Sequence, residues 1–304
     1  MKKVLITGGA GFIGSHLTKR LVQDGNKVIV LDCLLRGNKL DHDILNNCQV
    51  VVDDVRNDEL VDNLVKGCDE VYHFSAVLGV DVVADNPVET MDTEVIGLRN
   101  VTNAALKYKT NKVIYASTSG VYGHSAIEKS ATETIQLDPR TSYAIAKRYN
   151  EIYLKALYEE KGLKSISVRV FNIYGKKQDN RMVIPRFLEQ ALEGNPITVF
   201  GEGKQTRDFT YIDDTIEAVL KLAEKVDGCE IFNVANEDEK TIEEVAETIV
   251  KVTGSKSPIT YLEAPRKRYD YEVERRYGSS EKLFKAIGFK PNRTLEDGIK
   301  AILA

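Results

Sequence analysis

A tyrosine and a lysine four residues apart are well suited to acid–base chemistry. Tyr143 and Lys147 lie in the run Ser142-Tyr-Ala-Ile-Ala-Lys147, and this spacing places both on one face of a helix. An ammonium group stabilises a neighbouring phenolate, so we expect Lys147 to lower the pKa of Tyr143 toward neutrality. Such pairs also occur on solvated helix surfaces, so other features of the chain must distinguish a catalytic pair from an ordinary exposed one.

Hydroxyl groups and histidines provide the other candidates. Ser117-Thr-Ser119 follows an apolar run and precedes Gly120, and Tyr122 either borders a ligand or packs this turn. Histidine titrates near neutrality, but we assign no catalytic role to His73 or His124. His73 is expected to be buried at a strand end, and His124 to lie in a solvent-exposed loop.

A glycine-rich turn stands at the start of the chain. The apolar run Val4 to Ile6 leads through Thr7 to Gly8, Gly11 and Gly14, and a helical stretch begins near Ser15. In a parallel α/β unit the first glycine permits the tight turn, the second lets the backbone approach a pyrophosphate, and the third lets the helix pack near the strand. The N–H groups of the helix N-terminus then meet the anion.

Carboxylates that follow the next two strands define the nucleotide. Asp32 ends the run from Lys27, 18 residues beyond Gly14, where an acid accepts the ribose hydroxyls and repels a 2′-phosphate. NAD is therefore favoured over NADP, although NADP is not excluded because Arg36 follows four residues later. Asp53 and Asp54 follow the third strand, and they either bind the adenine amino group or cap the helix that begins near Asn57.

The elements that position these residues alternate between strand and helix patterns. Short apolar runs are separated by helical spacing through two thirds of the chain, which predicts a doubly wound parallel sheet. The expected strands are 4–6, 28–31, 50–52, 70–74, 112–116, 165–170 and 231–234, and the expected helices include 60–65, 94–107 and 144–159. Ligands bind such sheets at the carboxyl ends of the strands. Beyond Thr241 we expect an amphipathic helix and a last helix near 280–286.

Composition narrows the function further. The 304 residues are 42% hydrophobic and carry a net charge of −4 without charge clusters, so nothing favours a nucleic-acid or membrane partner. No apolar run is long enough to span a bilayer, and the N-terminus leads straight into a strand, so we expect a cytoplasmic protein. The four cysteines and four histidines are dispersed, which argues against a disulfide framework or a metal site.

Several segments together resemble one family. They are Thr7-Gly-Gly-Ala-Gly-Phe-Ile-Gly14, His73-Phe-Ser-Ala76, Ser117-Thr-Ser119, Tyr143-x-x-x-Lys147, Arg169-x-Phe-Asn-x-Tyr-Gly175 and Gly201-Glu-Gly-x-x-x-Arg-Asp-Phe209. Their combination resembles the extended short-chain dehydrogenase/reductase superfamily, in its NAD-dependent nucleotide-sugar epimerase/dehydratase branch, over essentially the whole chain. The resemblance implies bound NAD, a nucleoside-diphosphate sugar as substrate, and a smaller C-terminal lobe that grips the nucleotide.

The resemblance also assigns roles to residues. Tyr143 would be the catalytic base, Lys147 its pKa modulator and a ribose ligand, and Thr118 the hydrogen-bond partner of the reacting sugar hydroxyl. The implied cofactor site comprises Gly8, Gly11, Phe12, Ile13, Gly14, Asp32, Asp54, Val55, Ser75, Tyr143 and Lys147, and the implied substrate site Ser119, Asn172, Arg181, Val183, Arg207 and Arg268. As alternatives, Asn172 is only a turn residue and Arg207 only a surface charge.

The residues after Thr118 favour one reaction of the branch. Similar 4,6-dehydratases carry Asp-Glu there and UDP-glucuronate decarboxylases a glutamate at the second position, whereas this chain has Ser119-Gly120. We therefore expect C4 epimerisation of a UDP-glucose, UDP-galactose or UDP-glucuronate type of sugar through a 4-keto intermediate. Decarboxylation, dehydration and a non-catalytic NAD sensor stay as alternatives, and retention of both Tyr143 and Lys147 argues against the sensor.

The chain departs from the family pattern at two places. Glu94-Val-Ile-Gly97 replaces the usual Asn-x-x-Gly, and Arg181 either binds a C6 carboxylate or is a solvated charge.

The expected NAD-binding domain is 1–174 with 208–240 returning to it, and the nucleotide-sugar lobe is 175–207 with 241–304. Helices 94–107 and 144–159 pair into a homodimer in similar proteins, and Ile145, Ile152 and Leu157 serve either that face or the core.

Overall fold

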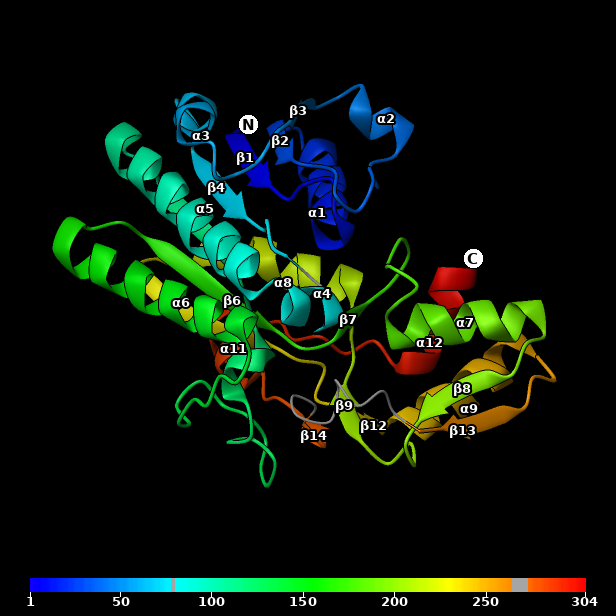
Figure 1. Cartoon of the computed structure of the whole chain (residues 1–304). Coiled ribbons are helices and arrows are strands. Elements are labelled where there is room, and N and C mark those ends of the chain that lie inside the picture. Colours follow the sequence, from blue (N-terminus) through cyan, green and yellow to red (C-terminus); the bar gives the residue numbers. More distant parts are fainter. Residues whose placement is uncertain (78–79, 264–272) are drawn as a thin grey trace. The chain divides into compact units, whose positions relative to one another are not determined.

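A seven-stranded sheet forms the centre of the fold (Figure 1). The computed structural model describes residues 1–77, 80–263 and 273–304, with the side chains of 80–82 also outside the description. The strand order is β11-β6-β5-β4-β1-β2-β3. Its members are β1 (Lys3–Thr7), β2 (Lys27–Asp32), β3 (Gln49–Val52), β4 (Glu70–His73), β5 (Lys112–Thr118), β6 (Ser165–Val170) and β11 (Cys229–Val234). The strands from β3 to β5 pair in parallel.

Helices connect the strands, and three small sheets follow later in the chain. The helices are α1 (Phe12–Gln23), α2 (His42–Leu45), α3 (Asp58–Val65), α4 (Val80–Asp85), α5 (Pro87–Tyr108), α6 (Ser142–Lys161), α7 (Val183–Glu193), α8 (Ile212–Lys225), α9 (Ile242–Thr253), α11 (Glu281–Ile287) and α12 (Leu295–Leu303), with a 3-10 turn, η1, at Ser119–Tyr122. The small sheets pair β7 (Ile173–Tyr174) with β10 (Thr210–Tyr211), β8 (Ile197–Phe200) with β13 (Ile259–Leu262), and β9 (Thr206–Asp208) with both β12 (Glu239–Thr241) and β14 (Arg275–Arg276).

The predicted doubly wound sheet is confirmed, and every strand expected from an apolar run is present. The strands are apolar because their side chains are buried: Leu5, Val71 and Val113 pack in one cluster with Leu64 of α3 and Val101 of α5. Helix starts were predicted less well. Helix α1 begins at residue 12 rather than near 15, because Gly11 is already extended and serves as its N-cap.

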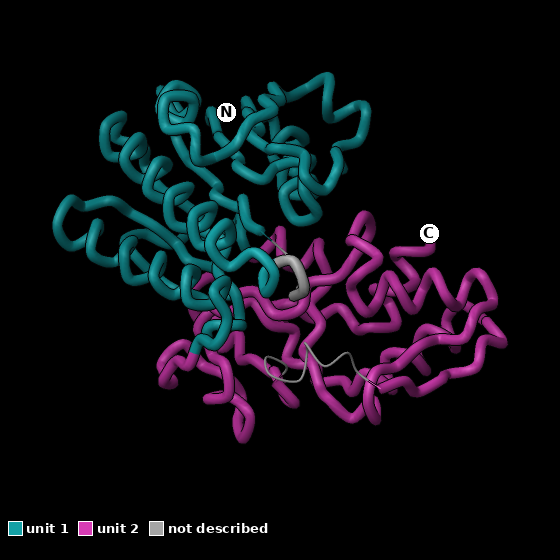
Figure 2. Tube along the Cα trace, in the orientation of Figure 1, with its two compact units in different colours: residues 1–121, 139–169, 219–232 teal, residues 122–138, 170–218, 233–304 magenta. Residues whose placement is uncertain are grey.

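The described chain forms two compact units (Figure 2). The first contains residues 1–121, 139–169 and 219–232, and the second contains 122–138, 170–218 and 233–304. The sequence divides the chain by ligand instead, as an NAD-binding domain and a nucleotide-sugar lobe. That division remains a prediction.

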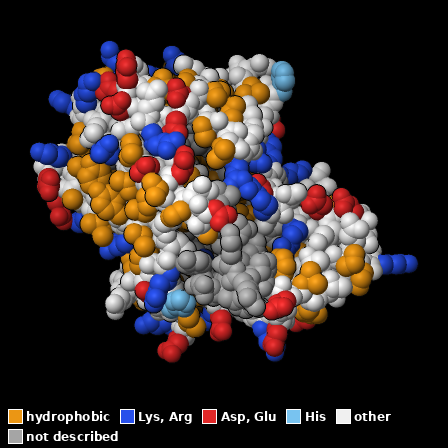
Figure 3. Space-filling view, in the orientation of Figure 1, with side chains coloured by type: hydrophobic (Ala, Val, Ile, Leu, Met, Phe, Trp, Pro, Cys, Tyr) orange, Lys and Arg blue, Asp and Glu red, His pale blue; other side chains and the backbone are white. Residues whose placement is uncertain are grey.

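The surface of α5 and α6 is apolar where the two helices pack side by side (Figures 1 and 3). Ile145 is 46% exposed and Ile152 is 54% exposed, whereas Leu157 packs against the core cluster of the first unit. Leu157 is therefore a core residue, and the expected homodimer remains a prediction that the two isoleucines support. Within the described residues, no helix is long and apolar enough to cross a membrane.

Candidate active site

The glycine-rich turn is packed so closely that it excludes side chains. Gly8 follows β1 with a φ of +71°, and a Cβ there would lie 2.7 Å from the backbone of Phe74. A Cβ on Gly14 would lie 2.0 Å from the carbonyl oxygen of Gly8. Gly11 N-caps α1, so the first-turn N–H groups at Phe12 and Ile13 have no helical acceptor and can meet an anion.

Asp32 lies beside this turn at the end of β2. Its two carboxylate oxygens accept hydrogen bonds from the Ala10 amide, at 2.9 Å, and from the Leu34 amide, at 2.8 Å. These bonds fix the carboxylate next to the glycine turn while the side chain stays half-buried. The diphosphate of NAD requires a close-packed turn that leads into a helix N-terminus, here that of the twelve-residue α1, and the adenosine ribose requires a fixed acid. The residues present therefore fit this cofactor.

Asp54 lies two residues beyond the end of β3 and is paired within its own turn. Its oxygens accept from Nε and Nη2 of Arg56 at 3.0 and 2.6 Å, and this guanidinium lowers the pKa of Asp54. The alternative that Asp53 and Asp54 cap the next helix is wrong, because the side chain of Asn57 accepts from the Leu60 amide and caps α3.

Two further predicted cofactor residues lie close to the strand ends. Val55 is 4% exposed, and its side chain would lie 2.7 Å from a Cβ placed on Gly97. Ser75 follows β4 and is half-buried, with its amide donating to the Thr7 hydroxyl at 3.4 Å. Both lie in the first unit with the glycine turn, and their contacts to NAD remain predictions.

Neither histidine discussed above has the setting of a catalytic base. His73 is fully buried against Tyr115, with Nδ1 2.8 Å from the Thr7 hydroxyl. Burial and the charge of Lys147 lower the pKa of His73 to about 3, so its ring is neutral. His124 is exposed, 3.7 Å from Asp138, and both histidines are placed as predicted.

Tyr122 has a packing role. The side chain is fully buried, and its hydroxyl donates to Oδ1 of Asn233 at 2.7 Å. Its ring also packs near Phe171. Of the two possibilities raised by the sequence, packing of the turn is the one that the structure shows.

Tyr143 and Lys147 share one face of α6, as predicted. Thr141 N-caps this helix by accepting from the Ala144 amide, so Tyr143 stands in its first turn. Lys147 is fully buried, and its Nζ lies 5.4 Å from the centre of the Tyr143 ring and 4.7 Å from the centre of the Tyr115 ring. Tyr143 itself remains half-buried.

The predicted lowering of the Tyr143 pKa is wrong for the protein alone. The structure instead raises the pKa of Tyr143, first because the phenol is desolvated and second because the Glu94 carboxylate is near. Glu94, from α5, lies with Oε2 2.8 Å from the Lys147 ammonium, in an ion pair that lacks the alignment of a hydrogen bond. The charge of Lys147 is therefore balanced before it can act on the phenol.

Thr118 is the last residue of β5, a strand that packs against α6. Its hydroxyl oxygen accepts from the Gly120 amide at 3.0 Å, which leaves the hydroxyl proton to be donated to another group. The side chain is half-buried, whereas the next residue, Ser119, is only 3% exposed. Of these two hydroxyl side chains, Thr118 is the more accessible.

Four of the residues predicted to bind the nucleotide sugar lie in the second unit, namely Asn172, Arg181, Val183 and Arg207, whereas Ser119 lies in the first. Asn172 donates to the main-chain oxygen of Asp208 at 3.1 Å, and Arg207 donates to that of Thr206 at 2.7 Å. Val183 begins α7. Arg181 is exposed and forms a two-pronged ion pair with Asp179, so a substrate carboxylate would compete with that pair. Arg268 lies outside the described residues.

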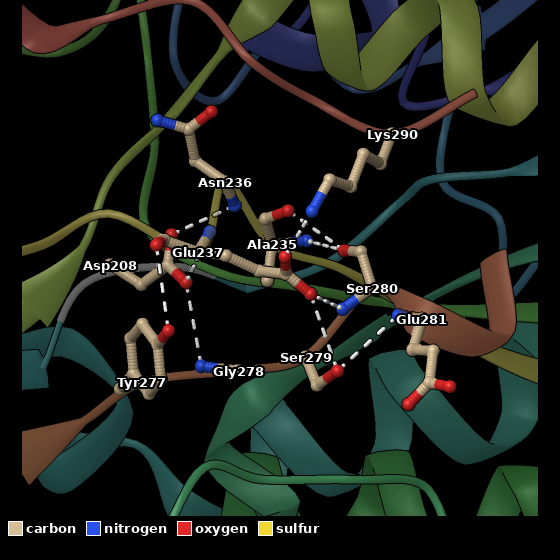
Figure 4. Close-up of polar contacts among 10 residues, drawn as sticks. All are labelled: Asp208, Ala235, Asn236, Glu237, Tyr277, Gly278, Ser279, Ser280, Glu281 and Lys290. Atoms are coloured by element: carbon tan, nitrogen blue, oxygen red, sulfur yellow. Dashed lines mark hydrogen bonds and ion pairs between the residues drawn. The ribbon is translucent and has the colours of Figure 1, made fainter. Parts of the chain in front are cut away.

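A buried carboxylate next to Arg207 joins three segments of the second unit (Figure 4). Asp208 is fully buried, and its oxygens accept from the amides of Asn236, Glu237 and Gly278 at 2.9, 3.1 and 3.4 Å. Glu237 in turn accepts from the Ser280 amide and pairs with Lys290. This cluster fixes the end of the strand that carries Arg207.

The chain matches a known protein family. The sequence model of the NAD dependent epimerase/dehydratase family matches residues 4–235. The chain belongs to this family. The resemblance read from the motifs is confirmed, and so is NAD as the cofactor of the family.

Members of the family with different reactions match almost the full chain. A UDP-N-acetyl-alpha-D-glucosaminuronate decarboxylase of Bacillus cytotoxicus is 40% identical, covering 98% of this chain and 96% of its own. A putative UDP-glucose 4-epimerase of Methanocaldococcus jannaschii is 32% identical, covering 99% and 97%. The crystal structure of UDP-glucose 4-epimerase with UDP-glucose from Thermotoga maritima superposes with a TM-score of 0.92 at 30% identity, covering 99% and 97%.

Sequence reasoning missed two charged groups of this epimerase/dehydratase family member. Asp208 was part of a quoted motif but was given no role, because hydrogen bonds to distant backbone amides leave no local pattern. Glu151 was also missed, although it is fully enclosed with Arg169 as its partner at 2.7 Å. The available signal was a charged residue on the buried face of a helix, Glu151, together with one inside an apolar strand, Arg169, since buried charges occur in pairs.

Asp208 gives the stability of the protein a pH dependence of known sign. Burial raises the pKa of Asp208 from its ordinary 3.8 to about 7. The folded protein therefore holds a proton that the unfolded chain has released, and this contribution to stability is lost as the pH rises through about 7. We expect the melting temperature of the wild type to fall, relative to Asp208→Asn, as the pH is raised from 5 to 8. Parallel curves for the two proteins would contradict this assignment.

Proposed function

We propose that the protein inverts the configuration at C4 of a UDP-sugar, with NAD as cofactor. The observation that carries the proposal is the placement of Thr118 at the end of β5 and of Tyr143 and Lys147 on α6, the helix packed against that strand. The two residues after Thr118 are Ser119 and Gly120, so this turn has no carboxylate to expel a hydroxyl group. This apparatus supports oxidation and reduction at C4.

The side chains have distinct tasks in this proposal. The phenol oxygen of Tyr143 takes the proton of the C4 hydroxyl and later returns it, while the Thr118 hydroxyl orients the same sugar oxygen. The glycine turn and Asp32 would hold the pyrophosphate and the adenosine ribose, and Lys147 the nicotinamide ribose. NAD supplies the reversible hydride acceptor. Asn172 and Arg207 would hold the diphosphate of the substrate, since a guanidinium fork suits phosphate oxygens.

Decarboxylation of a UDP-uronate is the second candidate, because a 40% identical relative is a decarboxylase. It would begin with the same C4 oxidation, which turns the uronate into a β-keto acid. The C5–C6 bond then breaks with loss of carbon dioxide, its electrons form an enolate that takes a proton at C5, and the C4 ketone is reduced again. Arg181 would bind the uronate carboxylate in place of Asp179. Against this candidate, Gly120 offers no acid, and a Cβ at this position would lie 3.3 Å from the Thr118 hydroxyl oxygen.

The test is incubation of the NAD-loaded protein with neutral and uronate UDP-sugars, with and without an N-acetyl group, followed by proton NMR of the products. We expect a product inverted at C4 with the same number of carbon atoms. Release of carbon dioxide from a uronate would establish the decarboxylase. Retention of NAD without turnover of any UDP-, dTDP-, GDP- or CDP-sugar would favour the sensor.

A further inference from the structure

A fully buried acid–base pair lies next to the proposed catalytic tyrosine. Glu94 and Lys147 have side-chain exposures of 0% and 1%, and their charged atoms are 2.8 Å apart. The pair is built into the contact between two long helices, because Asn150 of α6 donates to the Glu94 main-chain oxygen at 3.0 Å and to the Tyr115 hydroxyl at 2.9 Å. Neither charged group can relax into solvent.

Each element packed around Lys147 presents a group that is neutral or already paired. From β4 comes His73, which is neutral, and from β5 comes Tyr115, whose pKa burial raises well above its ordinary value. The carboxylate of Glu151 on α6 accepts from Arg169 of β6, Arg148 of α6 and Ser117 of β5. Glu94 is thus the described carboxylate left to balance Lys147.

The opposing charges of Lys147 and Glu94 together determine whether Tyr143 is protonated. A lone ammonium near a phenol favours the phenolate, whereas a lone carboxylate favours the phenol. With both present at close range their effects largely cancel, and desolvation then keeps the phenol protonated. A further positive charge beside the ring is needed to make it a base. Oxidised nicotinamide carries such a charge and reduced nicotinamide does not.

We propose that Glu94 is a positioning residue that holds Lys147 as an ion pair and thereby keeps Tyr143 protonated unless oxidised cofactor is bound beside it. The inference rests on the proposed function, in which Tyr143 is the base. Its consequence is that Tyr143 accepts the C4 proton when the cofactor is ready to accept hydride, and returns the proton when the cofactor has been reduced. The proton and the hydride are then transferred in the same direction.

The test is the isosteric variant Glu94→Gln, read by the absorbance of tyrosinate during a pH titration of the NAD-loaded protein. The signal of Tyr143 is isolated from the other 13 tyrosines by subtracting the titration of the matching protein that also carries Tyr143→Phe. With the opposing charge removed, we expect Tyr143 to ionise about one to three pH units lower than in the wild type. The acidic limb of the kcat profile should shift in the same direction.

Two controls keep the result specific. Asp92→Asn removes an exposed carboxylate from the same helix, and it should leave the tyrosinate titration unchanged. Glu94→Asp keeps the charge and should restore most of the wild-type titration. If Glu94→Gln does not fold because it buries an unpaired ammonium, the double variant Glu94→Gln/Lys147→Met removes both charges and should titrate like the wild type.

The outcomes separate this inference from the proposed function. An unshifted or upward-shifted titration in Glu94→Gln, or a lowered one in the double variant, overturns the role of Glu94 even if the protein epimerises UDP-sugars. A lowered titration in Glu94→Gln without turnover of any sugar nucleotide supports the control of Tyr143 by Glu94 and overturns the proposed reaction.

Discussion

Tyr143→Phe is expected to lower kcat by about a hundredfold to ten-thousandfold, because that is the usual contribution of a positioned acid–base group. The substitution removes only the phenol oxygen, the one atom that can exchange a proton with the C4 hydroxyl in the proposed mechanism. Tyr143 lies in the first turn of α6, and this turn is capped by Thr141 rather than by the phenol. The helix should therefore form as before. The measurement is kcat on the UDP-sugar that the wild type converts, together with the amount of NAD released on denaturation.

Tyr149→Phe is the matched control for this variant. Tyr149 lies on the same helix, is 49% exposed, and stacks on Tyr153 rather than on Lys147. Its loss of a hydroxyl should leave kcat within about twofold of the wild type, since surface substitutions rarely have larger effects. Equal activity of the two variants, with NAD bound to both, would remove Tyr143 from the role of proton acceptor.

The fold could be predicted from the sequence because its signals are local. Each buried strand leaves an apolar run, each helix a spacing of three to four residues, and the turn after Thr7 requires glycines that are adjacent in the chain. Helix α12 was missed although Thr294 caps it by accepting from the Asp297 amide, a pattern that is visible in the sequence. It is only nine residues long, so its helical periodicity is short.

The state of the candidate site could not be predicted in the same way. The spacing of Tyr143 and Lys147 places them correctly on one helix face, but the pKa of Tyr143 depends on a carboxylate from another helix. The sequence marks Glu94 only as a departure from the family pattern, because no local pattern shows which buried cation it contacts. The reaction is undetermined for a related reason: relatives with near-complete coverage include both a decarboxylase and a putative epimerase.

Arg169→Met is expected to lower the free energy of unfolding by about 3–5 kcal/mol, the usual cost of removing one partner from a buried ion pair. Arg169 is 1% exposed and donates to both oxygens of Glu151, from Nε at 2.8 Å and from Nη2 at 2.7 Å. Methionine fills a similar volume but leaves Glu151 with the half-buried Arg148 and the Ser117 hydroxyl as its partners. The measurement is denaturant unfolding followed by circular dichroism, since the chain has no tryptophan.

The double variant Arg169→Met/Glu151→Leu distinguishes a charge effect from a packing effect. If the cost of the single variant is an uncompensated carboxylate, removing that carboxylate should recover most of the lost stability. If the cost comes from the shape of the arginine, the double variant should be no more stable than the single one. The pair joins α6 to β6 and reaches β5 through Ser117, one residue before Thr118. Recovered stability with reduced kcat would therefore show that this pair aligns the proposed catalytic groups as well as stabilising the fold.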